Sequence, residues 1–319
     1  MELEHLWKLY LPLVSWVSLG LVLGYKLPPF VPLALGKFLF WIGVPLSTLS
    51  FLRQVDLSAS VWIAPIAAWI SMLLGAWLAW LWIQAQIRGF AWPMLRVWST
   101  ERLQQTSSQG SFLLASMLGN TGYLGYPIAL VLVGTQYFGW TVFYDTLGTT
   151  LGAYGFGVVL AAHFGNTAAN SRQLLLALIQ NPTLWSFWIA LGSRSVPLPQ
   201  PIEQGLAGLA WAMVALSLLL MGMRLSQLRF WKHFPQAAVS LSIKMLFVPL
   251  LIGFSLTQIG LTGFPRLAIV LQAAMPPAFA TLVIAEAYNL DRELTVTLLA
   301  LGSLLLLLFL PLWLALFAA

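Results

Sequence analysis

The sequence predicts an all-α integral membrane protein, and three observations support that prediction. Hydrophobic residues fill 60% of the 319 positions and charged residues only 8%, whereas soluble domains carry roughly 25% charged residues. Apolar runs of about 18 to 25 residues, each long enough to cross a bilayer as a helix, recur along the whole chain. Segments of about ten residues with alternating polarity, which are typical of transmembrane barrels, are not seen.

Ten transmembrane helices are expected from these runs, at 6–24, 33–52, 60–82, 111–134, 137–163, 174–192, 205–223, 237–258, 264–288 and 294–317. The first run starts without a small-residue cleavage site and is interpreted as a retained helix. The polar stretch 84–110 mixes arginines with aromatic residues, which suits a segment on the membrane surface.

The ten helices are expected to form two inverted five-helix repeats. Aligning Asn120 with Pro277 superimposes the two segments that glycine and proline interrupt, and aligning Arg53 with Arg224 superimposes the second and seventh segments. Because each half has an odd number of spans, the halves would have opposite orientations, as in many secondary transporters. The expected domains are residues 1–163 and 174–319, joined by a short cytoplasmic linker at 164–173.

The basic residues predict the orientation in the membrane. Lys8, Arg53, Arg194 and Arg266 fall on the side of the N-terminus, and a larger set falls on the other side: Lys26, Lys37, Arg88, Arg96, Arg102, Arg172, Arg224, Arg229, Lys232 and Arg292. The positive-inside rule then makes the second side cytoplasmic and both termini non-cytoplasmic, in a multi-pass plasma or inner membrane protein. The basic residues are spread singly, so nucleic acid is not an expected partner.

The stretch 118–127, Leu-Gly-Asn-Thr-Gly-Tyr-Leu-Gly-Tyr-Pro, predicts a break in the fourth segment, with the second half beginning after Gly122. Three glycines and a proline cannot all keep regular helical hydrogen bonds. Irregular backbone at bilayer depth lines a wet cavity or is buried in protein, and the unpaired amides of a half-helix favour an anion. Asn120 and Thr121 could cap that half or reach a ligand. Candidate substrate-binding residues here are Asn120, Thr121, Gly122 and Pro127.

A second break is expected in the ninth segment. Pro276 and Pro277 remove two amide donors and free carbonyls upstream, and Thr281 offers a hydroxyl just beyond them. Candidate substrate-binding residues here are Pro276, Pro277, Phe279 and Thr281. Both breaks have an alternative interpretation as ordinary kinks, because glycine and proline are frequent in membrane helices.

Two charged residues lie inside apolar segments. Asp145 is the candidate for coordinating a coupling proton or sodium ion, or is a structural partner of a neighbouring helix. Lys244 could balance Asp145, attract an anionic substrate, or extend its side chain to the cytoplasmic surface. Glu286 lies beside Asp291, Arg292 and Glu293 and is better explained as an interface residue than as part of a proton path.

Enzyme chemistry is not expected. The chain has no cysteine and three histidines, all near segment ends, and it contains no HExxH, GxSxG or phosphate-loop motif. Gly119, Gly122 and Gly125 follow no predicted strand, and a dinucleotide-binding glycine motif requires one, so a dinucleotide site is not expected. No metal site and no cofactor are predicted.

The motif 119–127 closely resembles the fourth-helix motif of the auxin efflux carrier family of membrane transporters. The run 275–279, followed by Glu286 and then Leu290-Asp291, resembles the ninth-helix motif of bacterial members, and Tyr144-Asp145 and Asn181-Pro182 also fit. The resemblance implies ten helices in two inverted repeats with the broken fourth and ninth crossing near the substrate, as in sodium-proton antiporters and bile-acid symporters. It also implies transport of organic anions. The short linker 164–173 fits a compact prokaryotic member.

The hypothesis that follows is a carrier that moves a small organic anion, a carboxylate, by alternating access. The half-helix amino ends and Asn120 would hold the carboxylate, Asp145 would bind H⁺ or Na⁺, and Lys244 would compensate charge. Two alternatives stay open, a non-transporting membrane sensor or scaffold on the same fold and an anion channel. The expected surroundings are the lipid bilayer, with a homodimer left open.

Overall fold

The computed structural model describes residues 3–55, 59–88, 102–165, 179–226 and 233–318, together with Leu176. Every regular element in these ranges is a helix, and no strand occurs among the described residues. Six helical runs in this part of the chain are long and apolar enough to cross a membrane: Phe30–Gln54, Ser60–Ile87, Thr135–Phe164, Gln200–Leu225, Phe234–Gln258 and Arg292–Phe317. The prediction of an all-α membrane protein is therefore confirmed.

The described helices follow the order of the predicted segments. The first half contains α1 (Leu3–Lys26), α2 (Phe30–Phe38), η1 (Leu39–Gly43), α3 (Val44–Gln54), η2 (Ala59–Trp62), α4 (Ile63–Ile87), η3 (Arg102–Gln104), α6 (Thr106–Met117), η4 (Thr121–Gly125), α7 (Tyr126–Leu132), η5 (Thr135–Tyr137), α8 (Phe138–Phe143), η6 (Tyr144–Thr150), η7 (Ala153–Gly157) and α9 (Val158–Phe164). The second half contains α11 (Pro182–Gly192), α12 (Gln200–Leu225), α13 (Phe234–Ser242), η8 (Ile243–Phe247), α14 (Val248–Gln258), α15 (Gly263–Ala273), α16 (Phe279–Ala287) and α17 (Arg292–Phe317).

The stretch 84–110 is more helical than predicted. Residues 84–87 continue α4, and α6 begins at Thr106, before the predicted start of the fourth segment. Glutamine and alanine are good helix formers, so a helix can extend past the end of an apolar run. Most of the expected surface segment, 89–101, and most of the linker 164–173 lie outside the described residues.

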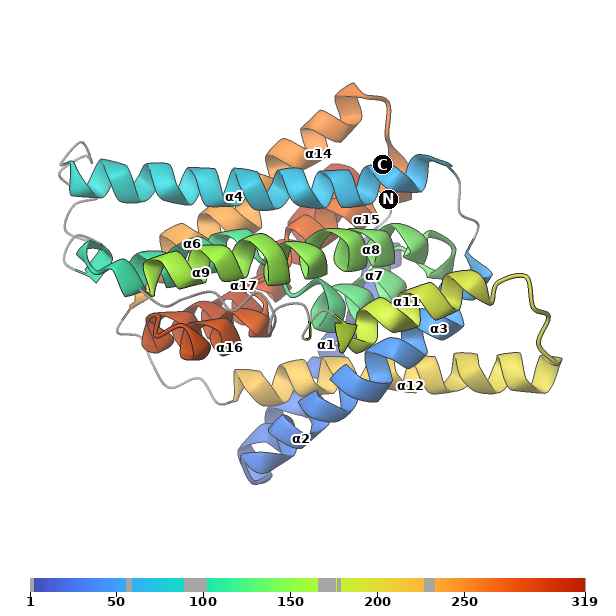
Figure 1. The fold of residues 1–319 in the computed structure, drawn as a ribbon. Helices are drawn as coiled ribbons and strands as arrows, with labels where there is room; N and C mark the ends of the chain where they lie inside the picture. Colours follow the sequence, from blue (N-terminus) through green and yellow to red (C-terminus); the bar gives the residue numbers. More distant parts are fainter. Residues whose placement is uncertain are drawn as a thin grey trace.

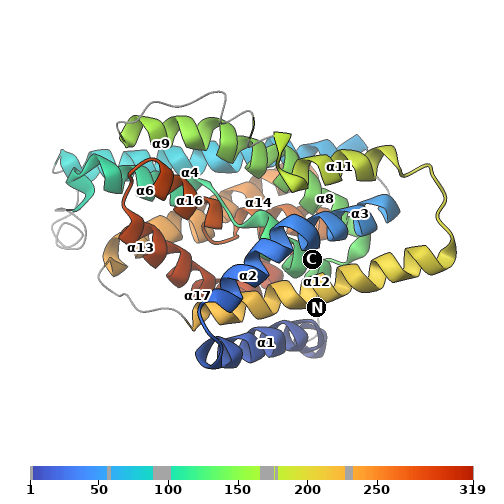
Figure 2. The ribbon, with the colours of Figure 1, turned by 60° about the horizontal axis from the view of Figure 1, so that its bottom comes forward.

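The long helices run lengthwise through the molecule, with α4 along one edge and α12 along the opposite edge (Figure 1). Helix α1 packs along α12, as Figure 2 also shows. Glycines allow this close approach, since a Cβ atom on Gly222 would lie 1.9 Å from the main-chain oxygen of Val17. Small residues at such contacts are typical of helix pairs in membranes.

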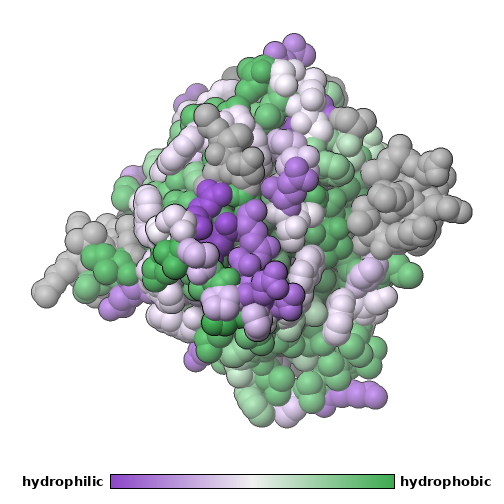
Figure 3. Space-filling view, turned by 90° about the vertical axis from the view of Figure 1, so that its right-hand side faces the viewer, coloured by the Kyte–Doolittle hydropathy of each residue, from purple (hydrophilic) through white to green (hydrophobic). Residues whose placement is uncertain are grey.

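The outer face of the molecule is apolar where lipid would cover it. On α4 the exposed side chains include Ile66, Ile70, Leu73 and Trp77, while small residues of the same helix face inward. Figure 3 shows the end of the molecule that lies at the right of Figure 1, where hydrophilic residues gather in the middle and hydrophobic residues surround them. Polar helix ends and apolar helix sides are what a bilayer requires.

Two short helices, α6 and α15, occupy the centre of the core. The side chains of Phe112 and Leu114 on α6, and of Leu267 and Leu271 on α15, have no exposed surface. Most residues of both helices are buried, the polar side chains of Ser116 and Gln272 among them. Both helices end inside the protein, at Met117 and Ala273, where the chain leaves helical geometry.

Candidate functional site

The two predicted breaks meet in space. After α6 the chain is non-helical through residues 118–120, and after α15 it is irregular through residues 274–278. Gly119 and Pro277 form an antiparallel bridge. The amide of Asn120 donates to the oxygen of Pro276 at 2.7 Å, and the amide of Ala278 donates to the oxygen of Leu118 at 3.0 Å. These bonds satisfy backbone groups that the missing helical turns would otherwise leave unpaired.

The second half of the fourth segment begins at Thr121, two residues earlier than the predicted start after Gly122. Asn120 occupies the capping position, but its side chain makes no capping hydrogen bond. Among the described residues, no acceptor pairs with the amides of residues 121–123. The start of this half-helix therefore carries the partial positive charge of unpaired amides.

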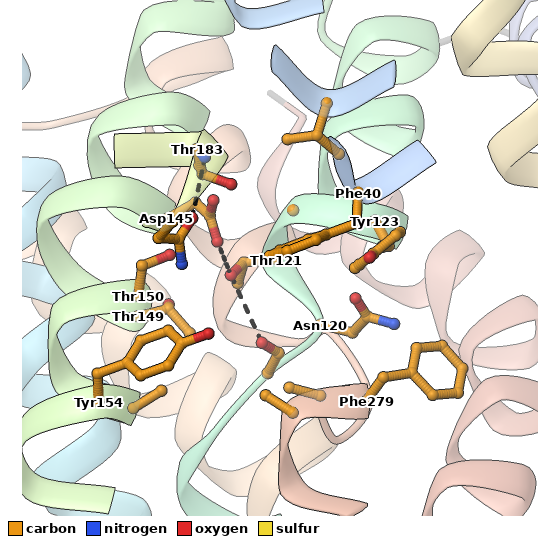
Figure 4. Close-up of a pocket in the computed structure, with 17 residues that line it drawn as sticks. Phe40, Asn120, Thr121, Tyr123, Asp145, Thr149, Thr150, Tyr154, Thr183 and Phe279 are labelled. Atoms are coloured by element: carbon orange, nitrogen blue, oxygen red, sulfur yellow. Dashed lines mark hydrogen bonds between the residues drawn. The ribbon is translucent and has the colours of Figure 1, made fainter. Parts of the chain in front are cut away.

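The Nδ2 atom of Asn120 is unpaired. It is 3% exposed, and no described group accepts a hydrogen bond from its Nδ2 atom. Figure 4 shows Asn120 at a cavity, on the same side as Tyr123 and Phe279. A buried amide without a partner costs free energy that a bound acceptor would recover.

Asp145 lies on the opposite side of the same cavity (Figure 4). The hydroxyl of Thr121 donates to its Oδ1 atom, and the hydroxyl of Tyr126 donates to its Oδ2 atom at 2.9 Å. A Cβ atom on Gly122 would lie 3.4 Å from Oδ2, an ordinary van der Waals distance, so the carboxyl group packs against the first turn of the half-helix. The carboxyl group thus faces the positive end of that half-helix.

Lys244 is buried at the crossing and does not extend to the surface, so the alternative of a surface-directed side chain is wrong. Its side chain is 2% exposed, and its Nζ atom donates to the oxygen of Ala273 at 3.0 Å. Ala273 ends α15, where unpaired carbonyls favour a cation. No ion pair joins Lys244 to Asp145 in the described part of the chain.

The cavity between these groups has a volume of about 100 Å³, which is room for several water molecules or a small ligand. Both breaks contribute to its wall, together with η1, η6, η7 and the start of α11. The lining residues are Phe40, Val44, Gly119, Asn120, Thr121, Gly122, Tyr123, Asp145, Thr149, Thr150, Ala153, Tyr154, Asn181, Thr183, Ala278, Phe279 and Ala280. Asp145 is the only ionisable carboxyl group or amine among them.

Sequence reasoning missed several polar lining residues, namely Thr149, Thr150, Tyr154 and Thr183. Thr149 follows Asp145 by about one turn, so a search for hydroxyls on the same helix face would have found it. The segment that contains Asp145 forms π-helical turns from Tyr144 to Thr150 and from Ala153 to Gly157. Such wide turns are frequent at functional sites, and no sequence pattern used above predicts them.

Four predicted binding residues lie near the cavity but not in its wall. Pro127 occupies the first turn of α7, and Pro276 and Pro277 lie in the backbone crossing itself. The hydroxyl of Thr281 donates to the oxygen of Ala278 at 2.6 Å. Their role as ligands stays a prediction, and in this structure they shape the crossing.

Glu286 lies outside the cavity. Its Oε1 atom accepts a 2.6 Å hydrogen bond from Nε of Arg292, and both side chains are more than half exposed. No group of three histidine, aspartate or glutamate residues gathers at a point within the described ranges.

A family profile described as "Membrane transport protein" matches residues 11–314. The chain belongs to this family. The resemblance to the auxin efflux carrier family is thereby confirmed. Membership places the crossing and its cavity inside a transport protein, and favours a role other than catalysis.

Two archaeal relatives agree with this membership. An uncharacterized transporter of Methanothermobacter thermautotrophicus is 27% identical over 283 residues, which cover 88% of this chain and 87% of the relative. An uncharacterized transporter of Methanocaldococcus jannaschii is 28% identical over 212 residues, which cover 64% of this chain and 67% of the relative. The first match covers 88% of this chain, and an alignment of that length includes both breaks.

Proposed function

We propose that this chain is a secondary active transporter that carries a small organic anion, a carboxylate, by alternating access. The observation that carries the proposal is the unpaired Nδ2 atom of Asn120, buried at the wall of a cavity beside unpaired half-helix amides. These groups are all hydrogen-bond donors. A carboxylate supplies acceptors and a negative charge, and both fit such a set.

The same cavity contains Asp145, and this suggests how transport is coupled. A carboxylate ligand and the Asp145 carboxylate would repel each other within one small cavity of low dielectric constant. Binding a proton or a sodium ion at Asp145 would remove that repulsion. Thr121 and Tyr126 add hydroxyl oxygens next to the carboxyl group, and oxygen ligands suit hard cations. We therefore propose symport of the anion with H⁺ or Na⁺.

We further propose ten transmembrane helices in two inverted repeats, 1–163 and 174–319, with both termini on the non-cytoplasmic side of the plasma or inner membrane. The proposal is supported by two helix breaks that meet at equivalent places in the two halves. It is also supported by the charges next to the breaks. Lys244 faces the carboxyl end of α15, and Asp145 faces the amino end of the half-helix that starts at Thr121.

Uptake by purified protein in liposomes tests the proposed function. A panel of labelled mono- and dicarboxylates would first be screened by thermal shift, with and without sodium and at two pH values. Hits would then be tested for counterflow, in which unlabelled anion inside the vesicle drives uptake of labelled anion. A carrier gives counterflow, a channel gives currents above carrier turnover without counterflow, and a sensor or scaffold gives neither. Binding without counterflow would contradict the proposal.

A further inference from the structure

A second cavity lies next to the first, on the other side of Phe279. It has a volume of about 240 Å³ and is bordered by the last turn of α12, the first turn of α16 and the N-terminal half of α17. Arg224 and Ser303 are its polar lining residues, and the rest of the wall is aliphatic apart from Phe279. Phe279 is also part of the wall of the first cavity, so this one side chain borders both.

Arg224 is held in place by three neighbours. Its guanidinium carbon lies 3.5 Å from the centre of the Phe279 ring, within the range of a cation-π contact. A Cβ atom on Gly36 would lie 2.8 Å from a terminal nitrogen of Arg224, so the guanidinium group packs closely against this glycine. Tyr123 closes the group by donating to the oxygen of Gly36 at 3.4 Å and by meeting the Phe279 ring edge to face.

Within the described part of the chain, Arg224 has no carboxylate partner. Glu286 pairs with Arg292, Glu293 with His233, and Asp291 accepts from Ser108 and from the amide of Leu294. The Nε atom of Arg224 is buried and makes no hydrogen bond to a described group. A partly buried guanidinium without an anion is costly, and a carboxylate can pair with it through two parallel hydrogen bonds.

We propose that this second cavity is an additional binding station for the transported organic anion, with the carboxylate on Arg224 and the apolar part of the molecule against Leu282, Val296 and Leu299. The inference rests on the proposed transport function and adds a site to it. Phe279 separates this station from the Asn120 cavity, and an anion moves between the two when the Phe279 ring turns aside. The station selects anions that carry an apolar body, because most of its wall is aliphatic.

Uptake kinetics with three variants test the station. Arg224→Gln should raise KM roughly tenfold, the change expected for losing one charge-assisted hydrogen bond, with kcat little altered. Arg224→Lys keeps the positive charge, so its KM should lie between the KM of the wild type and that of Arg224→Gln. Lys37→Gln is the matched control, because Lys37 is an exposed cation one residue from Gly36 that lines neither cavity. Equal KM values for Arg224→Gln and Lys37→Gln would overturn the proposal.

A second pair of variants tests the apolar wall. Ala300→Leu fills the cavity from α17 and should raise KM more for long-chain than for short-chain carboxylates. Ala315→Leu adds the same group on the exposed face of α17 and should behave as wild type. An Ala300→Leu protein that keeps the wild-type KM for every chain length would contradict the assignment.

Binding stoichiometry separates this proposal from its alternatives. Delipidated wild-type protein should bind two carboxylates per chain and Arg224→Gln protein one. If the cavity holds only the phosphate of a bilayer lipid, Arg224→Gln will lose bound phospholipid with no change in KM, and the station is refuted. If wild-type protein transports no carboxylate, the proposed function fails, and the stoichiometry still decides whether Arg224 binds an anion.

Discussion

The Nζ atom of Lys244 lies 3.0 Å from the main-chain oxygen of Ala273, the last residue of α15. The cation thus faces the negative end of one broken helix, while Asp145 faces the positive end of the other. Each buried charge offsets the partial charge of a helix terminus that the break leaves inside the protein. Each of the two buried helix termini at the crossing therefore faces a side chain of opposite charge.

The contact between Lys244 and Gly119 gives a first prediction. A Cβ atom on Gly119 would lie 3.2 Å from Nζ of Lys244 and 3.4 Å from the oxygen of Met275. Because Nζ is held by the oxygen of Ala273, Gly119→Ala should lower the free energy of unfolding in detergent by about 1 kcal/mol, the low end of the usual cost of overpacking. Gly155→Ala is the control, since a Cβ atom there would meet no described atom within 4 Å.

A double-mutant cycle assigns that cost to Lys244. Combining Gly119→Ala with Lys244→Ala should give a coupling of at least about 0.5 kcal/mol, because the shortened side chain no longer crowds the new methyl group. Strictly additive effects would mean that Gly119 is required for another reason, such as the bridge to Pro277.

Much of this fold could be predicted from the sequence, because helix positions follow from apolar runs. The stretch 118–127 revealed its break, since glycine and proline act on the local backbone. The direction of the Lys244 side chain could not be predicted, because it depends on where α15 ends in space. The hydroxyl of Tyr154 was missed for a similar reason, since the π-helical turns between Asp145 and Tyr154 change which side chains share a face.

Asp145 should control ion dependence. Asp145→Asn removes the titratable group and its negative charge, so anion binding should lose its dependence on pH and sodium. Exchange of labelled for unlabelled anion should continue, while uptake driven by an ion gradient should stop. Both are measured in the same liposomes.

Glu286→Gln is the control for Asp145→Asn, because it removes a different carboxylate, one that lies outside the cavity. Glu286 pairs with Arg292 at the exposed end of α16, and its variant should keep the ion dependence of the wild type. If Glu286→Gln loses ion dependence and Asp145→Asn keeps it, the proton or sodium path runs through Glu286 and the role proposed for Asp145 is wrong.

The predicted orientation can be measured with single cysteines, because the natural chain has none. Lys26 at the end of α1 and Ser195 after α11 are exposed in the structure. In intact cells an impermeant thiol reagent should label Ser195→Cys from outside and should label Lys26→Cys only after the membrane is opened. The reverse pattern would place both termini in the cytoplasm.

Asn120 is the residue proposed to bind the carboxylate directly. Its substitution should weaken anion binding and leave the melting temperature nearly unchanged. Its Nδ2 atom has no partner among the described residues, so Asn120→Ala removes no internal hydrogen bond from that donor and should change the melting temperature little. The same variant should lose a donor to the bound carboxylate, which weakens binding by roughly tenfold or more.

The most direct test is carboxylate affinity measured by calorimetry on wild-type, Asn120→Ala and Asn120→Asp protein, with the melting temperature of each recorded in parallel. We predict weaker binding for alanine and the weakest for aspartate, which has the shape of asparagine but presents a negative charge to the anion. Wild-type affinity in both variants, with their melting temperatures unchanged, would contradict the assignment of Asn120 as a carboxylate ligand.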